Sequence, residues 1–213
     1  DLIDQTKNTI QKKKWILTII DVFSRFCWAL PLKNKESRTT AAAFRTVIQQ
    51  YNLDMFRPKI VCDQGKEFLG AFRRMVEDEY SMKIINVKTY MGVSVVERMN
   101  RTIREGLGRA KTRGQANWVT ALPLVVSNYN RTPHGSLGKT PPFVALNGWL
   151  QGDQRLIEYI RERTKKTNER NISQEGSRLP PGSRVRISLF AISSAFRKIA
   201  KQNGKSDDRR KLS

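Results

Sequence analysis

Acidic residues at the ends of predicted strands and helices are the side chains best suited to chemistry in this chain. Asp63 follows a short apolar strand predicted over residues 58–62, and Gln64-Gly65 turn the chain directly after it. A carboxylate at the C-terminal end of a strand, beside a glycine that permits a tight turn, is a common position for a metal ligand in α/β sheets. A surface turn would explain Asp63 alone equally well.

A second carboxylate, Glu97, lies in the first turn of a helix predicted from Ser94 to about Thr112. One face of this helix carries an apolar stripe with helical spacing, made of Val96, Met99, Ile103 and Leu107. A second stripe carries the carboxylate followed by cations, at Glu97, Arg101, Arg104, Gly108 and Lys111. The spacing predicts one buried face and one functional face. An ordinary helix-start Glu paired with Arg101 is the alternative interpretation.

A third acid would be needed near the centre of the sheet. The candidates are Asp1, Asp4 and Asp21. Periodicity alone favours Asp21, because it ends the strongest predicted strand, the continuous apolar run at residues 15–20. The residue pattern leaves this choice open.

Alternating strands and helices must position these acids. Residues 15–20 and 26–32 predict a hairpin, and Ser37 is expected to cap a helix that reaches about Tyr51. The remaining predicted elements are strands at 58–62 and 83–87 and helices at 67–79, 94–112 and 118–129. Strands alternating with helices after an opening hairpin predict a mixed α/β sheet.

The charge of the chain indicates a polyanionic partner. There are 40 Lys and Arg against 19 Asp and Glu, a formal net charge of +21. Nucleic acid is the commonest partner of so basic a protein, ahead of a membrane surface. Residues 151–213 are denser in positive charge, with 16 Lys and Arg against 7 Asp and Glu. The pattern predicts a core followed by an extension that grips a nucleic acid backbone.

Other classes are disfavoured by what the sequence lacks. Cys27 and Cys62 each lie in an apolar run and are expected to be buried hydrophobic residues. His134 is the only histidine, so a zinc finger of the usual Cys/His type cannot be assembled. No apolar run approaches the ~20 residues that span a bilayer. The chain begins at Asp1 without Met, and we expect it to be a piece of a longer polypeptide.

An ordered set of motifs between Asp1 and about Leu146 carries a family resemblance. The motifs are "DLID", "ILTIIDVFSR", "VCDQGKEF", "SVVERMNRTI" and "NYNRTPHGSLGKTPPFVAL". Together they resemble the catalytic core of retroviral integrases, and they look closest to the integrases of Polinton/Maverick and gypsy-type elements. The resemblance implies an RNase H-like fold: a mixed five-stranded sheet flanked by helices, then a linker and a partial small β-barrel that "LPPGSRVRISLF" would begin. The implied domains are a catalytic core at 1–150, a charged linker helix and hinge at 151–178, and the start of a DNA-binding barrel at 179–213.

The resemblance also implies the catalytic residues. The family uses Asp, Asp and Glu, which fall on Asp1, Asp63 and Glu97. Asp1 is favoured over Asp4 because the family's first Asp lies on the strand before the hairpin, and Asp21 falls in a segment that is not a metal ligand. These carboxylates would hold two Mg²⁺ or Mn²⁺ ions for cleavage of a DNA 3′ end and its transfer into target DNA. Two departures from the family are a Gln at position 64, where Asn is usual, and a slightly shorter spacing between Asp63 and Glu97.

DNA contacts are expected from residues around this site and from the C-terminal segment. They are Lys88, Tyr90, Asn100, Arg101, Arg104, Lys111, Arg184 and Arg186. Asn100, just off the cationic stripe, could alternatively support the site. The implied partners are element ends, target DNA and further copies of the chain, with no membrane partner, acting in the host nucleus. We expect His134 to be structural, since a lone histidine is rarely a catalyst.

Two other functions remain compatible with the sequence. A transposase or nuclease of the same fold would share the three acids and differ only in its products. A DNA-binding architectural protein, or one domesticated from an integrase, would bind DNA without catalysis. The intact set of three acids argues against the second alternative.

Overall fold

The computed structural model describes residues 1–56, 58–86 and 94–175. The chain divides into two units, Asp1–Glu169 and Arg170–Ser213. The first unit holds every element with described side chains. In chain order the elements are β1 (Leu2–Asp4), η1 (Thr6–Asn8), β2 (Trp15–Ile20), β3 (Cys27–Leu32), α1 (Ser37–Tyr51), η2 (Leu53–Phe56), β4 (Ile60–Cys62), η3 (Lys66–Phe68), α2 (Ala71–Arg74), η4 (Met75–Glu79), β5 (Ile84–Asn86), α3 (Ser94–Thr112), α4 (Trp118–Arg131), η6 (Gly135–Leu137), α5 (Pro142–Leu150) and α6 (Gln154–Glu175).

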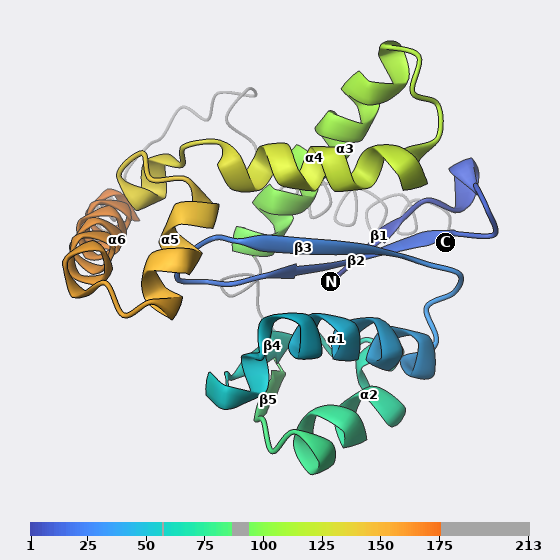
Figure 1. The fold of residues 1–213 in the computed structure, drawn as a ribbon, viewed down its shortest axis with the longest axis horizontal. Helices are drawn as coiled ribbons and strands as arrows, with labels where there is room; N and C mark the ends of the chain where they lie inside the picture. Colours follow the sequence, from blue (N-terminus) through green and yellow to red (C-terminus); the bar gives the residue numbers. More distant parts are fainter. Residues whose placement is uncertain (57, 87–93, 176–213) are drawn as a thin grey trace, which may run out of the picture. The chain divides into compact units, whose positions relative to one another are not determined.

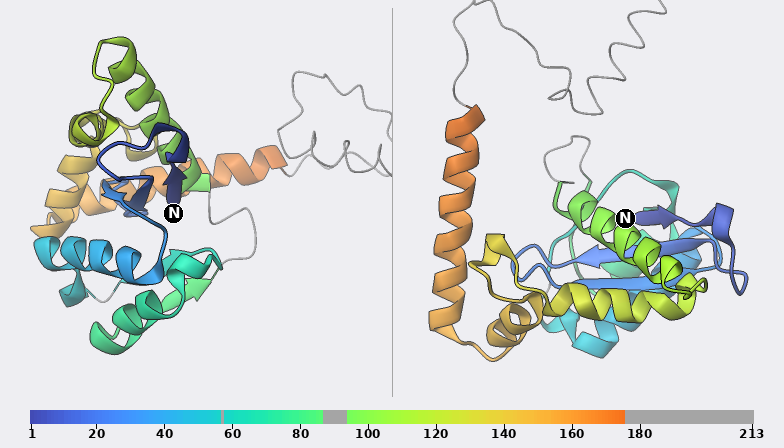
Figure 2. Two further views of the ribbon diagram at one scale, coloured as in Figure 1. Left: turned by 90° about the vertical axis from the view of Figure 1, so that its right-hand side faces the viewer. Right: turned by 90° about the horizontal axis from the view of Figure 1, so that it is seen from above.

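A three-stranded antiparallel sheet, in the order β1-β2-β3, forms the centre of the first unit. Figures 1 and 2 show α1 on one face of this sheet and α3 with α4 on the other. Successive residues of β2 therefore enter different cores: Leu17 packs with the α1 side and Ile16 with the α3 side. Both faces of β2 are covered, which explains why its sequence is apolar throughout rather than alternating.

The expected single sheet of five strands is not seen. β4 and β5 form a separate parallel pair, with Ile60 opposite Ile84, and no ladder joins this pair to β1 within the described residues. β1 and β4 each have only three residues, which leaves few backbone groups to build such a ladder. The two sheets still share one core, because Leu17 and Leu32 pack in the same cluster as Cys62 and Ile84. The mixed α/β class is confirmed.

The predicted helix at 67–79 is broken into three pieces, and the break involves Ser37. The chain forms η3, turns at Gly70 with φ +52, then forms α2 and a π-helical turn, η4. Ser37 does not cap its own helix, whose N-cap is Glu36. Its hydroxyl instead donates to the Leu69 carbonyl and accepts from the Phe72 backbone N–H at 2.8 Å. The predicted cap of α1 was therefore wrong, because Ser37 caps α2.

Helices α3 and α4 pack together over the sheet, and the predicted apolar stripe of α3 forms its buried face. Met99, Ile103 and Leu107 of α3 are buried in one cluster with Trp118 and Leu122 of α4. Asn130 of α4 fixes this layer to β3, because its amide accepts from the Cys27 N–H and donates to the Cys27 carbonyl, both at 2.9 Å. This pair satisfies backbone groups at the edge of the sheet that would otherwise lack partners.

A helix, α6, forms in the charged segment where a linker helix was expected, and its apolar residues are not simply solvated. Ile160 is fully buried in a cluster with Leu137 and Ala145. The predicted hinge and barrel, including Arg184 and Arg186, lie outside the described residues. Among the described residues no helix combines the length and hydrophobicity needed to cross a membrane. Both cysteines are buried and free, as predicted.

Candidate active site

Asp1 is fixed to the sheet by its backbone and to α3 by its side chain. Its carbonyl accepts from the Thr18 N–H at 2.8 Å, and its amino group donates to the Thr18 carbonyl at 3.0 Å. One carboxylate oxygen, Oδ1, accepts from the Leu2 N–H at 2.7 Å. The other, Oδ2, accepts from Nδ2 of Asn100 at 2.5 Å. The Asp1 carboxylate is therefore oriented by two donors from different elements.

Asn100 connects this carboxylate to the helix that carries Glu97. Its side chain is only 2% exposed, although it lies on a helix rich in exposed charge. Glu97 precedes it by three residues, so both side chains point to the same side of α3. Glu97 itself is exposed. Asn100 thus links α3, the helix that carries Glu97, to Asp1 at the start of β1.

Asp63 directly follows β4 and is held by the turn in which it lies. Its Oδ1 accepts from the Gly65 N–H at 3.0 Å. A Cβ atom at Gly65 would lie 3.0 Å from that same oxygen and 2.7 Å from Cδ of Glu67. Two carboxylates therefore converge on the space that Gly65 leaves open. Sequence reasoning treated Glu67 only as the start of a helix, and the Asp-Gln-Gly-Lys-Glu spacing was the signal that could have identified it.

Electrostatic interactions join the β1 and β4 ends. The amino group of Asp1 interacts with Asp63, Cys62 and Glu67. Burial lowers the pKa of this amino group to about 6, and the interactions with Asp63, Cys62 and Glu67 oppose that shift. Burial likewise raises the pKa of the Cys62 thiol, and Asp63 raises it further. Asp1 and Asp63, although distant in sequence, thus lie close enough for their charges to interact.

The two other candidates for the first acid serve local turns. Asp4 is exposed, and its Oδ1 accepts from the Thr6 N–H at 2.7 Å, which lowers the pKa of the Asp4 carboxyl. Asp21 accepts from both the backbone N–H and the hydroxyl of Ser24, at 2.7 and 2.5 Å. Neither carboxylate has a described hydrogen bond to α3. Of the three candidates, Asp1 has the contacts that the proposed site requires.

The donor set fits a hard divalent cation. Carboxylate oxygens are the ligands that Mg²⁺ and Mn²⁺ prefer. The Asn100 Oδ1 is buried without a hydrogen-bond partner, and a water molecule carried by such a cation would supply the missing donor. Within the described part of the chain, however, no three His, Cys, Asp or Glu side chains are grouped to hold a metal ion. Asp1, Asp63 and Glu97 therefore do not form a complete cage in this conformation.

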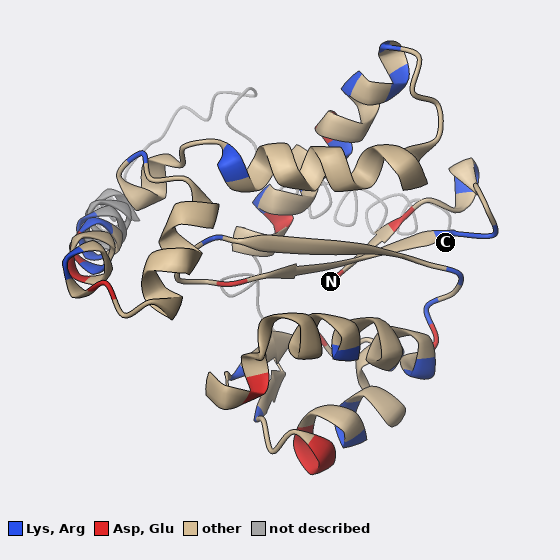
Figure 3. Ribbon diagram, viewed as in Figure 1, with Lys and Arg blue, Asp and Glu red and all other residues tan. Residues whose placement is uncertain are grey.

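Asn100, one of the predicted DNA-contacting residues, is buried and bonds Asp1, so it supports the site instead of facing DNA. The other predicted DNA-contacting residues on and before α3 fall into two groups. Arg101, Arg104 and Lys111 are exposed on α3, and in the described ranges none of them forms an ion pair. Figure 3 shows the blue Lys and Arg segments along this helix. Lys88 and Tyr90 lie outside the described residues. Three cations on the helix that carries Glu97 thus remain available to a phosphate backbone.

His134 lies apart from these acids. Its ring packs edge-on against Tyr129, with centroids 4.7 Å apart. Burial lowers the pKa of the imidazole, and Arg25 lowers it further, while a hydrogen bond to the Tyr129 backbone opposes both. The residue packs against the end of α4 and contributes nothing to the candidate site.

Comparison with known proteins identifies relatives among mobile elements and retroviruses. The profile of the integrase core domain family matches residues 2–90, a stretch that includes Asp63 but neither Asp1 nor Glu97. A transposon-derived protein of Caenorhabditis elegans is 27% identical over 128 residues, which cover 60% of this chain and 44% of that protein. The Gag-Pol polyprotein of gibbon ape leukemia virus is 30% identical over 142 residues, covering 63% of this chain and 8% of the polyprotein. That of feline leukemia virus is 30% identical over 136 residues, with 60% and 8% covered. The chain thus aligns with less than half the length of each of these relatives.

Proposed function

Because the chain contains an integrase core of the retroviral type, we propose that it cuts and joins DNA strands in a metal-dependent reaction. Water attacks a phosphodiester near the 3′ end of an element, and the 3′-hydroxyl leaves. That hydroxyl then attacks a phosphodiester of the target, which joins the two DNAs and releases a new 3′-hydroxyl. Action of this kind would take place in the host nucleus, by an assembly of several copies of the chain.

The observation that carries this proposal is the contact between Asp1 and Asn100. It links the Asp1 carboxylate to the helix that carries Glu97. Asp63, which directly follows β4, interacts electrostatically with Asp1. These two links support a site to which acids from three separate segments contribute, although the described residues hold no grouped set of three acids.

The chain's own groups have distinct tasks in this mechanism. Asp1, Asp63 and Glu97 would hold the metal ions, which neutralise the reacting phosphate and activate its nucleophile. Asn100 and the Leu2 N–H keep the Asp1 carboxylate in one orientation. The Gly65 N–H does the same for Asp63. Arg101 and Arg104 would bind phosphates adjacent to the one that reacts.

A strand-transfer assay with Mg²⁺ or Mn²⁺ tests the proposal. Asp63→Asn and Glu97→Gln should each reduce joining at least about a hundredfold, because charge neutralisation by metal contributes several kcal/mol. Asp4→Asn is the matched control and should leave joining nearly unchanged, since that carboxylate serves only a turn. Equal activity of wild type and Glu97→Gln would overturn the assignment.

The absence of a three-acid group among the described residues favours a second candidate. It is a DNA-binding protein derived from an integrase that no longer catalyses joining. In that case DNA would bind with similar affinity to wild type and Asp63→Asn, and neither protein would join strands with either metal. Strand joining by the wild-type protein but not by Asp63→Asn would exclude this candidate.

A further inference from the structure

A tight hairpin between β1 and β2, residues 5–14, carries a cluster of lysines that the candidate site does not use. The hairpin is closed by a hydrogen bond from the Gln5 N–H to the Lys14 carbonyl at 2.8 Å. At its tip, Ile10 and Lys13 exchange backbone hydrogen bonds of 3.3 and 2.8 Å. The tip is thereby held in one conformation, and we call this segment the lysine hairpin.

Five exposed lysines gather on and beside the lysine hairpin. Lys7, Lys12 and Lys14 belong to it, while Lys33 and Lys35 follow β3. A bond from the Lys14 N–H to the Leu32 carbonyl, 2.9 Å long, joins the two segments. Within the described ranges none of the five lysines forms an ion pair. Asp4 interacts electrostatically with Lys7 and Lys35, but its single negative charge offsets only part of the positive charge of the five lysines. The remaining cations repel one another, and a bound polyanion would relieve the repulsion.

The backbone at the tip indicates that its lysine is not there for stability. Gln11 and Lys12 both adopt left-handed conformations, with φ of 53° and 59°. A two-residue turn of this kind normally uses Asn-Gly, because side chains with a Cβ are strained there. Retained strain of this sort is characteristic of functional segments. Lys12 occupies a position where glycine would fit better.

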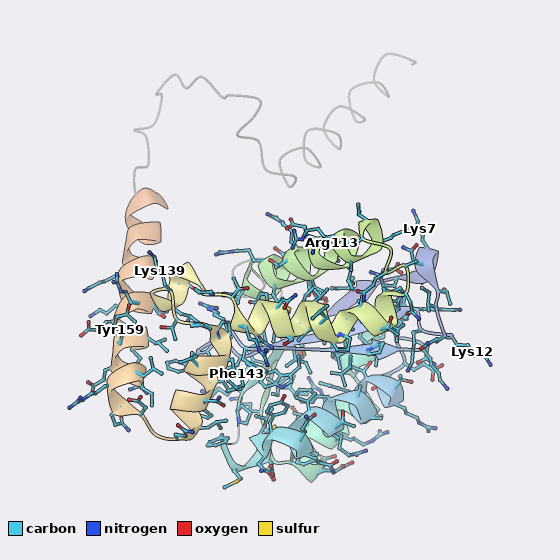
Figure 4. All side chains as sticks on the ribbon, turned by 45° about the horizontal axis from the view of Figure 1, so that its top comes forward. Lys7, Lys12, Arg113, Lys139, Phe143 and Tyr159 are labelled. Atoms are coloured by element: carbon cyan, nitrogen blue, oxygen red, sulfur yellow. The ribbon has the colours of Figure 1, made fainter. Side chains whose placement is uncertain are left out.

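Strand β1 connects the lysine hairpin to the candidate active site, because it runs from Asp1 directly into the hairpin. Lys7 is six residues from Asp1, so it lies at most about 20 Å away, which matches about six base pairs of duplex DNA. Trp118, the first residue of α4, donates from Nε1 to the Asn8 carbonyl of the hairpin at 2.7 Å. Figure 4 shows Lys7 and Arg113 at the same end of the first unit.

The chemistry of this surface favours nucleic acid over a membrane. None of the described residues 1–14 is a large hydrophobic side chain with high exposure. Ile10, the apolar residue nearest the tip, packs into the cluster beneath α3 and α4. A segment that binds the membrane interface needs apolar side chains to insert, whereas lysines alone suit a phosphate backbone.

We propose that the lysine hairpin, with Lys33 and Lys35, grips the phosphate backbone of duplex DNA within about six base pairs of the reacting phosphate. The inference rests on the proposed function in taking DNA as the partner. It adds a binding surface on β1 and β2 that extends the track of cations along α3. The hairpin recognises phosphates, so binding here is independent of base sequence.

Equilibrium binding without metal tests the proposal, measured by fluorescence anisotropy with a labelled 24-base-pair duplex over a range of salt concentrations. The triple variant Lys7→Gln, Lys12→Gln, Lys14→Gln should lower affinity for this duplex about tenfold or more at low salt. The slope of the logarithm of its binding constant against the logarithm of salt concentration should fall in magnitude by about 2–3, near 0.9 for each phosphate that is no longer neutralised.

The matched control removes three exposed lysines elsewhere, with Lys59→Gln, Lys83→Gln and Lys165→Gln. It has the same change in net charge and should leave the salt dependence nearly unchanged. Equal losses of affinity in the two triple variants would show that only net charge matters and would overturn the proposal. Binding of anionic phosphatidylserine vesicles that depends on the hairpin lysines, with DNA affinity unaffected, would also overturn it.

A second variant separates binding from folding. Gln11→Asn with Lys12→Gly should raise the thermal unfolding midpoint, because it relieves the strained turn, and should lower DNA affinity several-fold. Unchanged affinity would contradict the role of Lys12. These measurements also distinguish the two proposals. If the hairpin lysines are needed for DNA binding but the protein joins no strands, only the proposed function is overturned. If the protein joins strands equally well without the hairpin lysines, only this inference is overturned.

Discussion

Gly65 leaves the space that the carboxylates of Asp63 and Glu67 need for their positions beside β4. Its φ of −58° suits any residue, so alanine would introduce no backbone strain. An alanine Cβ would nevertheless lie 2.7 Å from Cδ of Glu67 and 3.0 Å from Oδ1 of Asp63. Gly65→Ala should therefore displace both carboxylates and reduce strand transfer at least about tenfold, since small misplacements of catalytic groups have large effects on rate.

The matched control for that substitution is Gly135→Ala, where a Cβ would meet nothing within 4 Å. Single-turnover strand transfer and thermal unfolding should be measured for both variants. We expect the unfolding midpoints of the two to be similar and only Gly65→Ala to lose activity. Full activity in Gly65→Ala would mean that the Asp63 position is not critical.

Asn100 is a positioning residue for Asp1. Removing its amide by Asn100→Ala frees the Asp1 carboxylate to rotate, because one of its two donors is removed. We expect the Mn²⁺ concentration that gives half-maximal strand transfer to rise about tenfold, by analogy with the loss of outer-shell partners at metal sites. Asn128→Ala, at an exposed position of α4, is the control. A fall in maximal rate with no change in metal dependence would indicate a merely structural role.

His134 should make folding sensitive to mild acid. Its pKa is lowered by burial, so below the ordinary value of about 6.5 the unfolded chain takes up a proton that the folded chain resists. The stabilising contribution is complete above that pH and is lost as the pH falls through the lowered value. Urea unfolding at a series of pH values should show a steeper loss of stability in wild type than in His134→Asn. Identical slopes would exclude a buried neutral imidazole.

At the scale of elements, close contact between α3 and α4 positions the start of α3. Gly106 allows this contact, because a Cβ there would lie 2.5 Å from Cγ1 of Val125. Alanine is favoured over glycine in a helix by about 1 kcal/mol, but overpacking against a stiff β-branched side chain costs about 1–3 kcal/mol. We expect the second effect to prevail, so that Gly106→Ala lowers the free energy of unfolding by about 1 kcal/mol.

Gly108 provides the opposite case on the same helix. It is exposed, and a Cβ there would meet nothing within 4 Å. Gly108→Ala should therefore raise the free energy of unfolding by up to about 1 kcal/mol. Denaturant unfolding of both variants checks the pair. If both substitutions stabilise, α3 and α4 are not packed as closely as described.

At the scale of the whole molecule, contacts between neighbours in sequence could be predicted, whereas contacts across the chain could not. The apolar stripe of Met99, Ile103 and Leu107 identified the buried face of α3, because helical periodicity is local. Ser37 was misassigned because its partners, Leu69 and Phe72, lie more than 30 residues away. No local pattern contains that information.

In the candidate site, too, local features could be predicted from the sequence, whereas contacts between distant residues could not. The position of Asp63 at a strand end and of Glu97 at a helix start followed from spacing alone. Among Asp1, Asp4 and Asp21, spacing favoured Asp21, whose carboxylate in fact binds Ser24. Family resemblance pointed to Asp1, whose link to Asn100 spans 99 positions. Pairing of the five predicted strands also depends on such distant contacts, and the described residues form two sheets instead of one.

The central claim is that acids from β1, β4 and α3 jointly bind divalent metal against a DNA phosphate. Electron paramagnetic resonance of Mn²⁺ titrated into the protein–DNA complex measures this directly. We predict tight binding to wild type and to Asp4→Asn, and at least about tenfold weaker binding to each of Asp1→Asn, Asp63→Asn and Glu97→Gln. Mn²⁺ affinities that are the same in all five proteins would contradict the account.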